Sequence, residues 1–136
     1  MTASVLRPLR FGLVGLFNTA LGLGVIFGAK AFLGLADLPA NMLGYGLGLL
    51  ASFALNRRWT FRDRGRVLPP MRRFGIAFGV AYGLNLATVF GLRDYAHLDA
   101  YTAQTIGVIA YASFFYFASA YYVFPTHRAS QVKPQD

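Results

Sequence analysis

Two adjacent arginines, Arg57 and Arg58, are the residues of this 136-residue chain best suited to bind an anion. They follow Asn56 and precede Trp59, an aromatic residue typical of a membrane interface. A guanidinium group can hold a phosphate through two parallel N–H···O hydrogen bonds. We therefore predict a phosphate site here. The plainer alternative is that both side chains only extend to the membrane surface.

Four amide side chains lie in otherwise apolar stretches: Asn18, Asn41, Asn85 and Gln104. An amide that faces lipid is costly, so we expect these groups to face the protein interior. There they could hydrogen-bond one helix to another, or they could line a polar passage for a lipid headgroup. The sequence leaves both interpretations open.

Groups for catalysis or metal binding are scarce. The chain has no Cys and no Glu, and His97 and His127 have no companions for a metal site. A proton-driven antiporter is disfavoured because no acid or histidine lies within a predicted membrane span. We expect neither an enzyme nor a cofactor or metal. The acids are Asp37, Asp63, Asp94, Asp99 and Asp136.

Composition places these residues in a membrane protein. Hydrophobic residues make up 56% of the chain and charged residues 13%, against about 25% charged in a soluble domain. The net charge of +8 could favour nucleic acid or an anionic membrane, and the hydrophobicity decides for the membrane, with no nucleic-acid partner expected. Four uncharged stretches are each long enough to span a bilayer core of about 30 Å. They are 11–29, 38–56, 74–92 and 100–126.

The predicted fold is therefore all-α, an integral membrane protein of four transmembrane helices in a single domain, 1–136. A cleaved signal peptide is disfavoured for the first stretch because it is long and carries Asn18 and Thr19. Basic residues concentrate before the first span, in the loop 57–73 and after the last span, where Arg128 and Lys133 lie. The positive-inside rule then predicts that both termini and this loop lie in the cytoplasm. We expect the membrane to be the cell inner membrane.

An internal repeat relates residues 10–61 to 73–124, at an offset of 63 residues with 11 identities in 52 positions. Each copy would be a helical hairpin that starts and ends inside, as in a parallel repeat, followed by a short tail, 125–136. The offset aligns Arg10 with Arg73, so both are expected at the inner phosphate site. It also aligns Asn41 with Gln104, and Lys30 with Arg93, which could form a weaker outer anion site.

Small residues recur at helical spacing and predict close helix packing. Gly44, Gly48, Ser52 and Asn56 share one face of the second span. Gly75, Gly79 and Gly83 form another stripe, in the third span, which could serve a homodimer contact.

These motifs together resemble the GtrA family of small four-helix membrane proteins. The resemblance rests on Arg-Phe-Gly-Leu-Val-Gly at 10–15 leading to Asn18-Thr19, on Ala40-Asn41, and above all on the segment 52–61. It covers about residues 7–125. In the second copy Ser119-Ala120-Tyr121 replaces Asn56-Arg57-Arg58, so an arginine site is expected to be asymmetric.

The resemblance implies translocation of a polyprenyl-phosphate-linked monosaccharide, such as undecaprenyl-phosphate glucose, from the inner to the outer leaflet for cell-surface polysaccharide synthesis. Arg57 and Arg58, helped by Arg10 and Arg73, would capture the phosphate. Amides would then offer hydrogen bonds to the crossing headgroup. The alternative is a non-transporting subunit that anchors or stabilises a polyprenyl-phosphate glycosyltransferase. The amides concerned are Asn56, Asn18, Asn85, Gln104 and, as a further candidate, Asn41.

Overall fold

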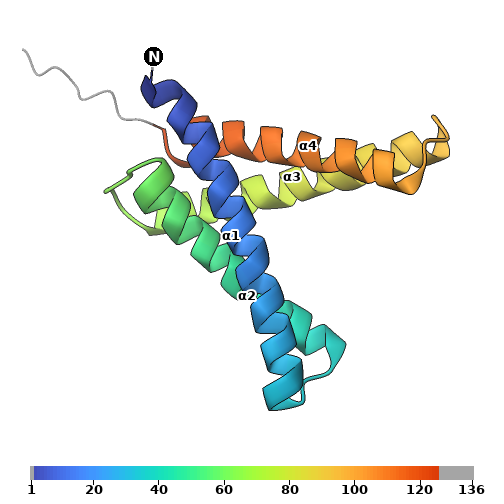
Figure 1. Ribbon diagram of the computed structural model, residues 1–136. Coiled ribbons are helices and arrows are strands. Elements are labelled where there is room, and N and C mark those ends of the chain that lie inside the picture. The colour runs from blue at the N-terminus through green and yellow to red at the C-terminus, as the bar shows by residue number, and fades with distance from the viewer. Residues whose placement is uncertain (1, 126–136) are drawn as a thin grey trace, which may run out of the picture. The chain divides into compact units, whose positions relative to one another are not determined.

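The computed structural model describes residues 2–125, and this part of the chain is all helical. The helices are α1 (Thr2–Leu33), α2 (Asp37–Leu55), α3 (Leu68–Asp94) and α4 (Ala100–Ala118), shown in Figure 1. Two π-helical turns, η1 (Asn56–Thr60) and η2 (Ser119–Val123), continue α2 and α4. The predicted four-helix fold is confirmed. The tail residues His127, Arg128, Lys133 and Asp136 lie outside the described residues.

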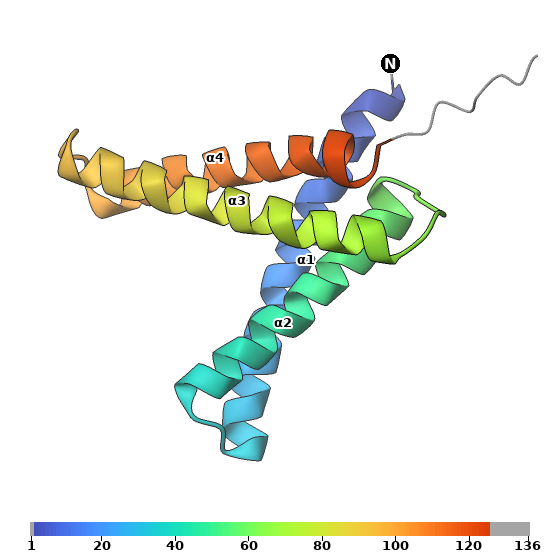
Figure 2. The ribbon, with the colours of Figure 1, turned by 180° about the vertical axis from the view of Figure 1, so that it is seen from behind.

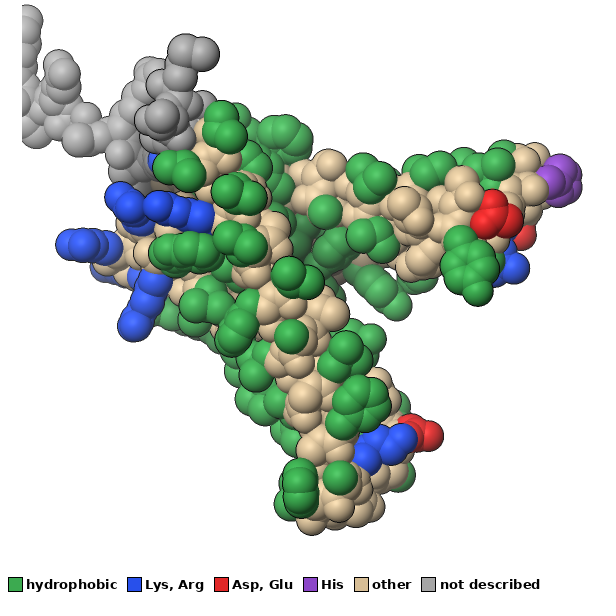
Figure 3. Space-filling view, viewed as in Figure 1, with side chains coloured by type: hydrophobic (Ala, Val, Ile, Leu, Met, Phe, Trp, Pro, Cys, Tyr) green, Lys and Arg blue, Asp and Glu red, His purple; other side chains and the backbone are tan. Residues whose placement is uncertain are grey.

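All four helices are long and apolar enough to cross a membrane. Large apolar side chains point outward, with Leu16 and Phe27 69% and 64% exposed. In Figure 3 apolar side chains line the lengths of the helices, and charged side chains gather near the helix ends. A helix satisfies its own backbone hydrogen bonds, so lipid can solvate such a surface. The chain is a multi-pass membrane protein, and its orientation stays a prediction.

The helices run past the charged residues that bounded the predicted spans. α1 already includes Arg7 and Arg10, and α3 includes Arg72 and Arg73. Long arginine side chains can reach the interface from a helix that continues beyond the apolar core. Charge therefore marks the edge of the membrane and does not end the helix.

The chain divides after Gly65 into two compact units, and each is a helical hairpin (Figure 2). Hairpin 1 consists of α1, α2 and η1, and hairpin 2 of α3, α4 and η2. One predicted repeat, 10–61, falls in the first unit and the other, 73–124, in the second.

The two helices of hairpin 1 approach one another at backbone distance. Gly44, Gly48 and Ser52 are buried on α2, and Ala40 is fully buried one turn earlier. A Cβ atom added at Gly44 would lie 2.8 Å from the carbonyl oxygen of Gly22 and 2.4 Å from Cγ1 of Ile26. The predicted small-residue face of the second span is thus the face that packs on α1.

In hairpin 2, α3 and α4 pack together through a close approach at Gly107 and through contacts between aromatic rings. A Cβ atom at Gly107 would lie 2.6 Å from Cγ2 of Val89. The Phe74 ring packs 5.0 Å from that of Phe115 and 6.4 Å from that of Phe124, measured between ring centres. These contacts hold the end of the hairpin where η2 lies.

The other predicted glycine stripe takes no part in this packing. Cβ atoms at Gly75, Gly79 and Gly83 would meet nothing within 4 Å. α3 buries a different face, which carries Phe74, Ala77, Ala81 and Asn85. The stripe is therefore not the surface that joins α3 to α4, and the predicted homodimer contact through it stays a prediction.

The two hairpins turn in the same way. Leu35 N donates to Ala29 O at 3.2 Å, and Leu98 N, 63 residues later, donates to Leu92 O at 3.1 Å. Each turn has a left-handed residue, Gly34 (φ 63°) and His97 (φ 53°). Only the second turn ends in a side-chain cap. The Asp99 carboxylate accepts hydrogen bonds from the backbone N–H groups of Tyr101 and Thr102 at 3.1 and 3.0 Å.

Replacement of Gly44 by alanine should destabilise hairpin 1 by about 1–3 kcal/mol, because the new methyl group overlaps the backbone of α1. The measurement is thermal unfolding in detergent. Gly46→Ala is the matched control, since a Cβ atom there meets nothing within 4 Å. Equal melting temperatures for the two variants would contradict the close approach.

Replacement of Asp99 by alanine should lower the melting temperature near neutral pH. Replacement by asparagine, which is also a good helix cap, should retain most of the stability that the cap provides. The hydrogen bonds from Thr102 hold the pKa of Asp99 below its usual 3.8. A carboxyl whose pKa is lowered on folding stabilises the folded state above its unfolded pKa. That stabilisation is lost as the pH falls through the lowered pKa. The advantage of wild type over Asp99→Asn should therefore shrink in acid, and a pH-independent difference would contradict this account.

Candidate functional site

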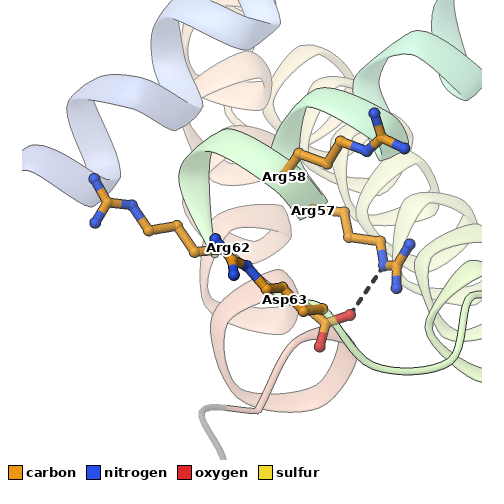
Figure 4. A pocket seen from close by; sticks show the side chains of 5 residues that line it. Arg57, Arg58, Arg62 and Asp63 are labelled. Atoms are coloured by element: carbon orange, nitrogen blue, oxygen red, sulfur yellow. Dashed lines mark hydrogen bonds and ion pairs between the residues drawn. The ribbon is translucent and has the colours of Figure 1, made fainter.

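A loop folds back on the end of η1 and is held there by Arg57. Arg57 Nε donates to Asp63 Oδ2 at 3.0 Å, and its guanidinium also donates to the carbonyl of Gly65. The backbone adds two bonds, from Asp63 N to Arg57 O at 2.9 Å and from Gly65 N to Asp63 Oδ1 at 3.3 Å. We call this group, Arg57, Asp63 and Gly65, the clasp. Figure 4 shows the Arg57 guanidinium facing the Asp63 carboxylate.

An open pocket of about 520 Å³ lies at the clasp. Arg58, Arg62 and Arg64 are exposed to solvent, whereas the Arg57 side chain is only 12% exposed. Four arginines and one aspartate give the lining a net positive charge. The size falls within the range of small-ligand sites, and guanidinium groups suit a phosphate. The lining residues are Arg57, Arg58, Arg62, Asp63 and Arg64.

A buried ladder of polar side chains supports η1, the turn that carries Arg57 and Arg58. Asn56 Nδ2 donates to Ser52 Oγ at 3.3 Å, and Thr60 Oγ1 donates to Asn56 Oδ1 at 3.0 Å. All three residues are buried, with Asn56 only 1% exposed. The widened π-helical turn closes with Phe61 N donating to Asn56 O at 2.8 Å. Such turns are frequent at functional sites.

Asn56 therefore has partners inside the hairpin for both ends of its amide. Its place in the structure is to hold the η1 turn and, through that turn, Arg57 and Arg58. Its predicted contact with a crossing headgroup stays a prediction.

Arg10 lies at the same end of hairpin 1 as this pocket. Its Nη1 donates to the carbonyl of Trp59 at 3.4 Å, and its guanidinium carbon lies 5.6 Å from the centre of the Trp59 ring. Arg73 makes the same pair of contacts with Tyr122 in hairpin 2, at 3.4 and 5.6 Å. Arg10 and Arg73 are thus each anchored to the η turn of their own hairpin.

The two midspan amides pack against glycines. A Cβ atom at Gly48 would lie 2.7 Å from Asn18 Oδ1, an oxygen that is buried and has no hydrogen-bond partner. Asn85, 8% exposed, packs in the same way against Gly107, where a Cβ would lie 2.9 Å from its Nδ2. Both lie between the helices of their hairpin, as expected for interior amides.

The outer amides do not share this position. Asn41 Nδ2 donates to the carbonyl of Asp37 in its own helix at 2.7 Å. Gln104 is exposed, outside the α3–α4 interface, so the expectation of an interior position is wrong for Gln104. The physical reason is helical spacing: the buried face of α4 runs through Ala103 and Gly107, and Gln104 is one residue out of step.

Sequence reasoning missed Arg62, Asp63 and Arg64 as site residues. The available signal was Asp63, which is the only acid among seven arginines between 57 and 73. At the opposite end of hairpin 1, Lys30 pairs with Asp37, which partly neutralises the predicted outer anion site. The described residues contain no cluster of three or more metal-ligating side chains.

Replacement of Asn56 by alanine should lower the free energy of unfolding by about 1–3 kcal/mol, because Ser52 and Thr60 would lose their buried partner. The check is thermal unfolding in detergent. Asn41→Ala is the control, since Asn41 bonds only its own helix. An Asn56→Ala variant as stable as wild type would show that the ladder does not support the turn.

Residues 10–124 match the family model described as the GtrA/DPMS transmembrane domain. A search of curated proteins returned no match. The matched range includes α1 from Arg10 onward, the other three helices with both π-helical turns, and all five residues of the pocket lining.

Proposed function

The chain belongs to the GtrA/DPMS transmembrane family, and from this premise we propose that it translocates a polyprenyl-phosphate-linked monosaccharide, such as undecaprenyl-phosphate glucose. Movement would run from the inner to the outer leaflet and supply cell-surface polysaccharide synthesis. Family membership supports a membrane role with such lipids. The observation that carries the proposal is the arginine pocket at the end of hairpin 1.

Capture of the substrate begins with its charge. A polyprenyl phosphate linked to a sugar keeps an anionic phosphate at the membrane surface, where the pocket presents exposed guanidinium groups. The prenyl chain stays in the lipid, against apolar side chains such as Leu16 and Phe27. The positive-inside rule predicts a cytoplasmic position for the pocket, so the substrate would be captured from the inner leaflet.

No proton coupling enters the proposal. Among the described helices, acids occur only at helix ends, as Asp37 at the start of α2 and Asp94 at the end of α3. A titrating carboxylate within the membrane is the usual means of proton-driven transport. We therefore propose facilitated movement, driven by consumption of the lipid-linked sugar in the outer leaflet, by a transporter and not an enzyme.

Removal of exposed pocket arginines should slow leaflet exchange in proteoliposomes. A short-chain polyprenyl-phosphate glucose is placed in both leaflets, and its accessibility to an outside-only reagent is followed over time. Arg58→Ala with Arg64→Ala should lower the protein-dependent rate roughly tenfold or more, because charge-assisted hydrogen bonds to the phosphate are lost. Arg66→Ala with Arg72→Ala removes the same charge from the same arginine-rich segment, 57–73, but outside the pocket lining, and should have little effect.

The second candidate function is that of a subunit that anchors a glycosyltransferase. Arg62, Arg64 and Arg66 are exposed, so the loop that carries them could serve as the docking surface for that enzyme. Absence of any exchange by folded, correctly inserted protein would contradict translocation and support this role. Replacement of the loop 57–73 by a neutral linker should then abolish co-purification with the glycosyltransferase.

A further inference from the structure

We propose that Arg57 is a positioning residue and not a phosphate ligand, and that Arg58, Arg62 and Arg64 bind the phosphate group. This inference rests on the proposed function for the nature of its ligand, a phosphate on a lipid, and assigns different roles to arginines that the sequence treats alike. It also places Asp63, an acid, in the structure of an anion site.

Two nitrogens of the Arg57 guanidinium, Nε and Nη2, are already engaged within the clasp. Its Nε is bonded to Asp63 at 3.0 Å, and its guanidinium also holds the Gly65 carbonyl. Its side chain is 12% exposed and that of Asp63 25% exposed. A phosphate bound in parallel to Nε and Nη2 of Arg57 would have to displace the Asp63 carboxylate and the Gly65 carbonyl. No such displacement is needed at the exposed guanidinium groups of the other three arginines.

The clasp determines where those arginines stand. Arg62 has a left-handed backbone, φ 54°, which is unfavourable for a residue with a side chain. The bonds from Arg57 to Asp63 and to Gly65 both span Arg62 and close the segment 57–65 into a loop. Asp63 itself bonds both Arg57 and the N–H of Gly65. The loop thereby brings Arg62 and Arg64 into the same pocket as Arg58, which is carried by η1.

The sign of one substitution separates positioning from competition. If Asp63 merely competed with phosphate for Arg57, Asp63→Asn would tighten binding, since it frees Arg57 and removes a negative charge. If the clasp positions the loop, the same substitution weakens binding although the pocket becomes more positive. Electrostatics and geometry thus predict opposite results.

The experiment is a binding titration on the full chain in detergent, read by the fluorescence of Trp59, the single tryptophan, which adjoins Arg58. The probes are a short-chain polyprenyl phosphate, the uncharged polyprenol and inorganic phosphate. We expect about tenfold weaker binding of the lipid phosphate by Asp63→Asn, by Arg57→Ala, and by the double variant, with no further loss in the double. Asp94→Asn, which removes the same charge elsewhere, should bind as wild type.

Arg57→Lys serves if Asp63→Asn melts before the assay temperature. Lysine keeps the charge but cannot hold a carboxylate and a carbonyl with one planar fork, so binding should still weaken. Tighter or unchanged binding by Asp63→Asn, or wild-type binding by Arg57→Lys, would overturn the positioning role. If the uncharged polyprenol bound as tightly as the polyprenyl phosphate, the phosphate site would be overturned. Binding of inorganic phosphate in addition to the lipid phosphate would support the phosphate group alone as the ligand. Phosphate binding without leaflet exchange would contradict translocation and leave this assignment standing.

Discussion

Contact between helices at backbone distance is the constraint on which the rest of each hairpin depends. Lipid tails are as apolar as leucine, so burial of apolar side chains does not drive these helices together, and close packing must do so. Gly44 lets α2 approach the carbonyl of Gly22, and Gly107 admits Val89 and Asn85 of α3. Large apolar residues such as Leu16 and Phe27 are then free to face lipid, while small ones such as Ala40 and Ala103 are buried between the helices. Buried phenylalanines lie toward the η ends of the hairpins.

This packing also dictates where polar groups can stand. Between the helices there is room for the amides of Asn18 and Asn85, each against a glycine. A longer polar network lies at the end of the second span, where Ser52, Asn56 and Thr60 form the ladder and the clasp follows beyond it. The ladder closes a π-helical turn in the last stretch of the span, and the arginines follow directly from it.

The fold could be predicted from the sequence because membrane spans depend on local composition. The buried face of α2 could also be predicted, because small residues recur there at helical spacing. Other features depend on contacts that no local spacing encodes. The clasp pairs Arg57 with Asp63 across a left-handed residue, where helical periodicity no longer applies. Gln104 was misplaced because its alignment with Asn41 says nothing about which face of α4 packs, and Asn41 itself bonds its own helix.

The difference between the two hairpins argues that the pocket is not a by-product of folding. Both anchor a basic residue on the η turn in the same way, Arg10 on Trp59 and Arg73 on Tyr122, so interfacial anchoring is already provided. At the position of Asn56, hairpin 2 has Ser119, which is fully buried with an unpaired hydroxyl and still carries a π-helical turn. Neither the turn nor the anchor therefore requires Arg57 and Arg58. Helix packing does not require the clustered arginines, and Asp63 holds Arg57 in place although its negative charge weakens the positive potential of the cluster. A topology signal depends on charge and not on fixed geometry. A ligand therefore explains this arrangement better than topology does.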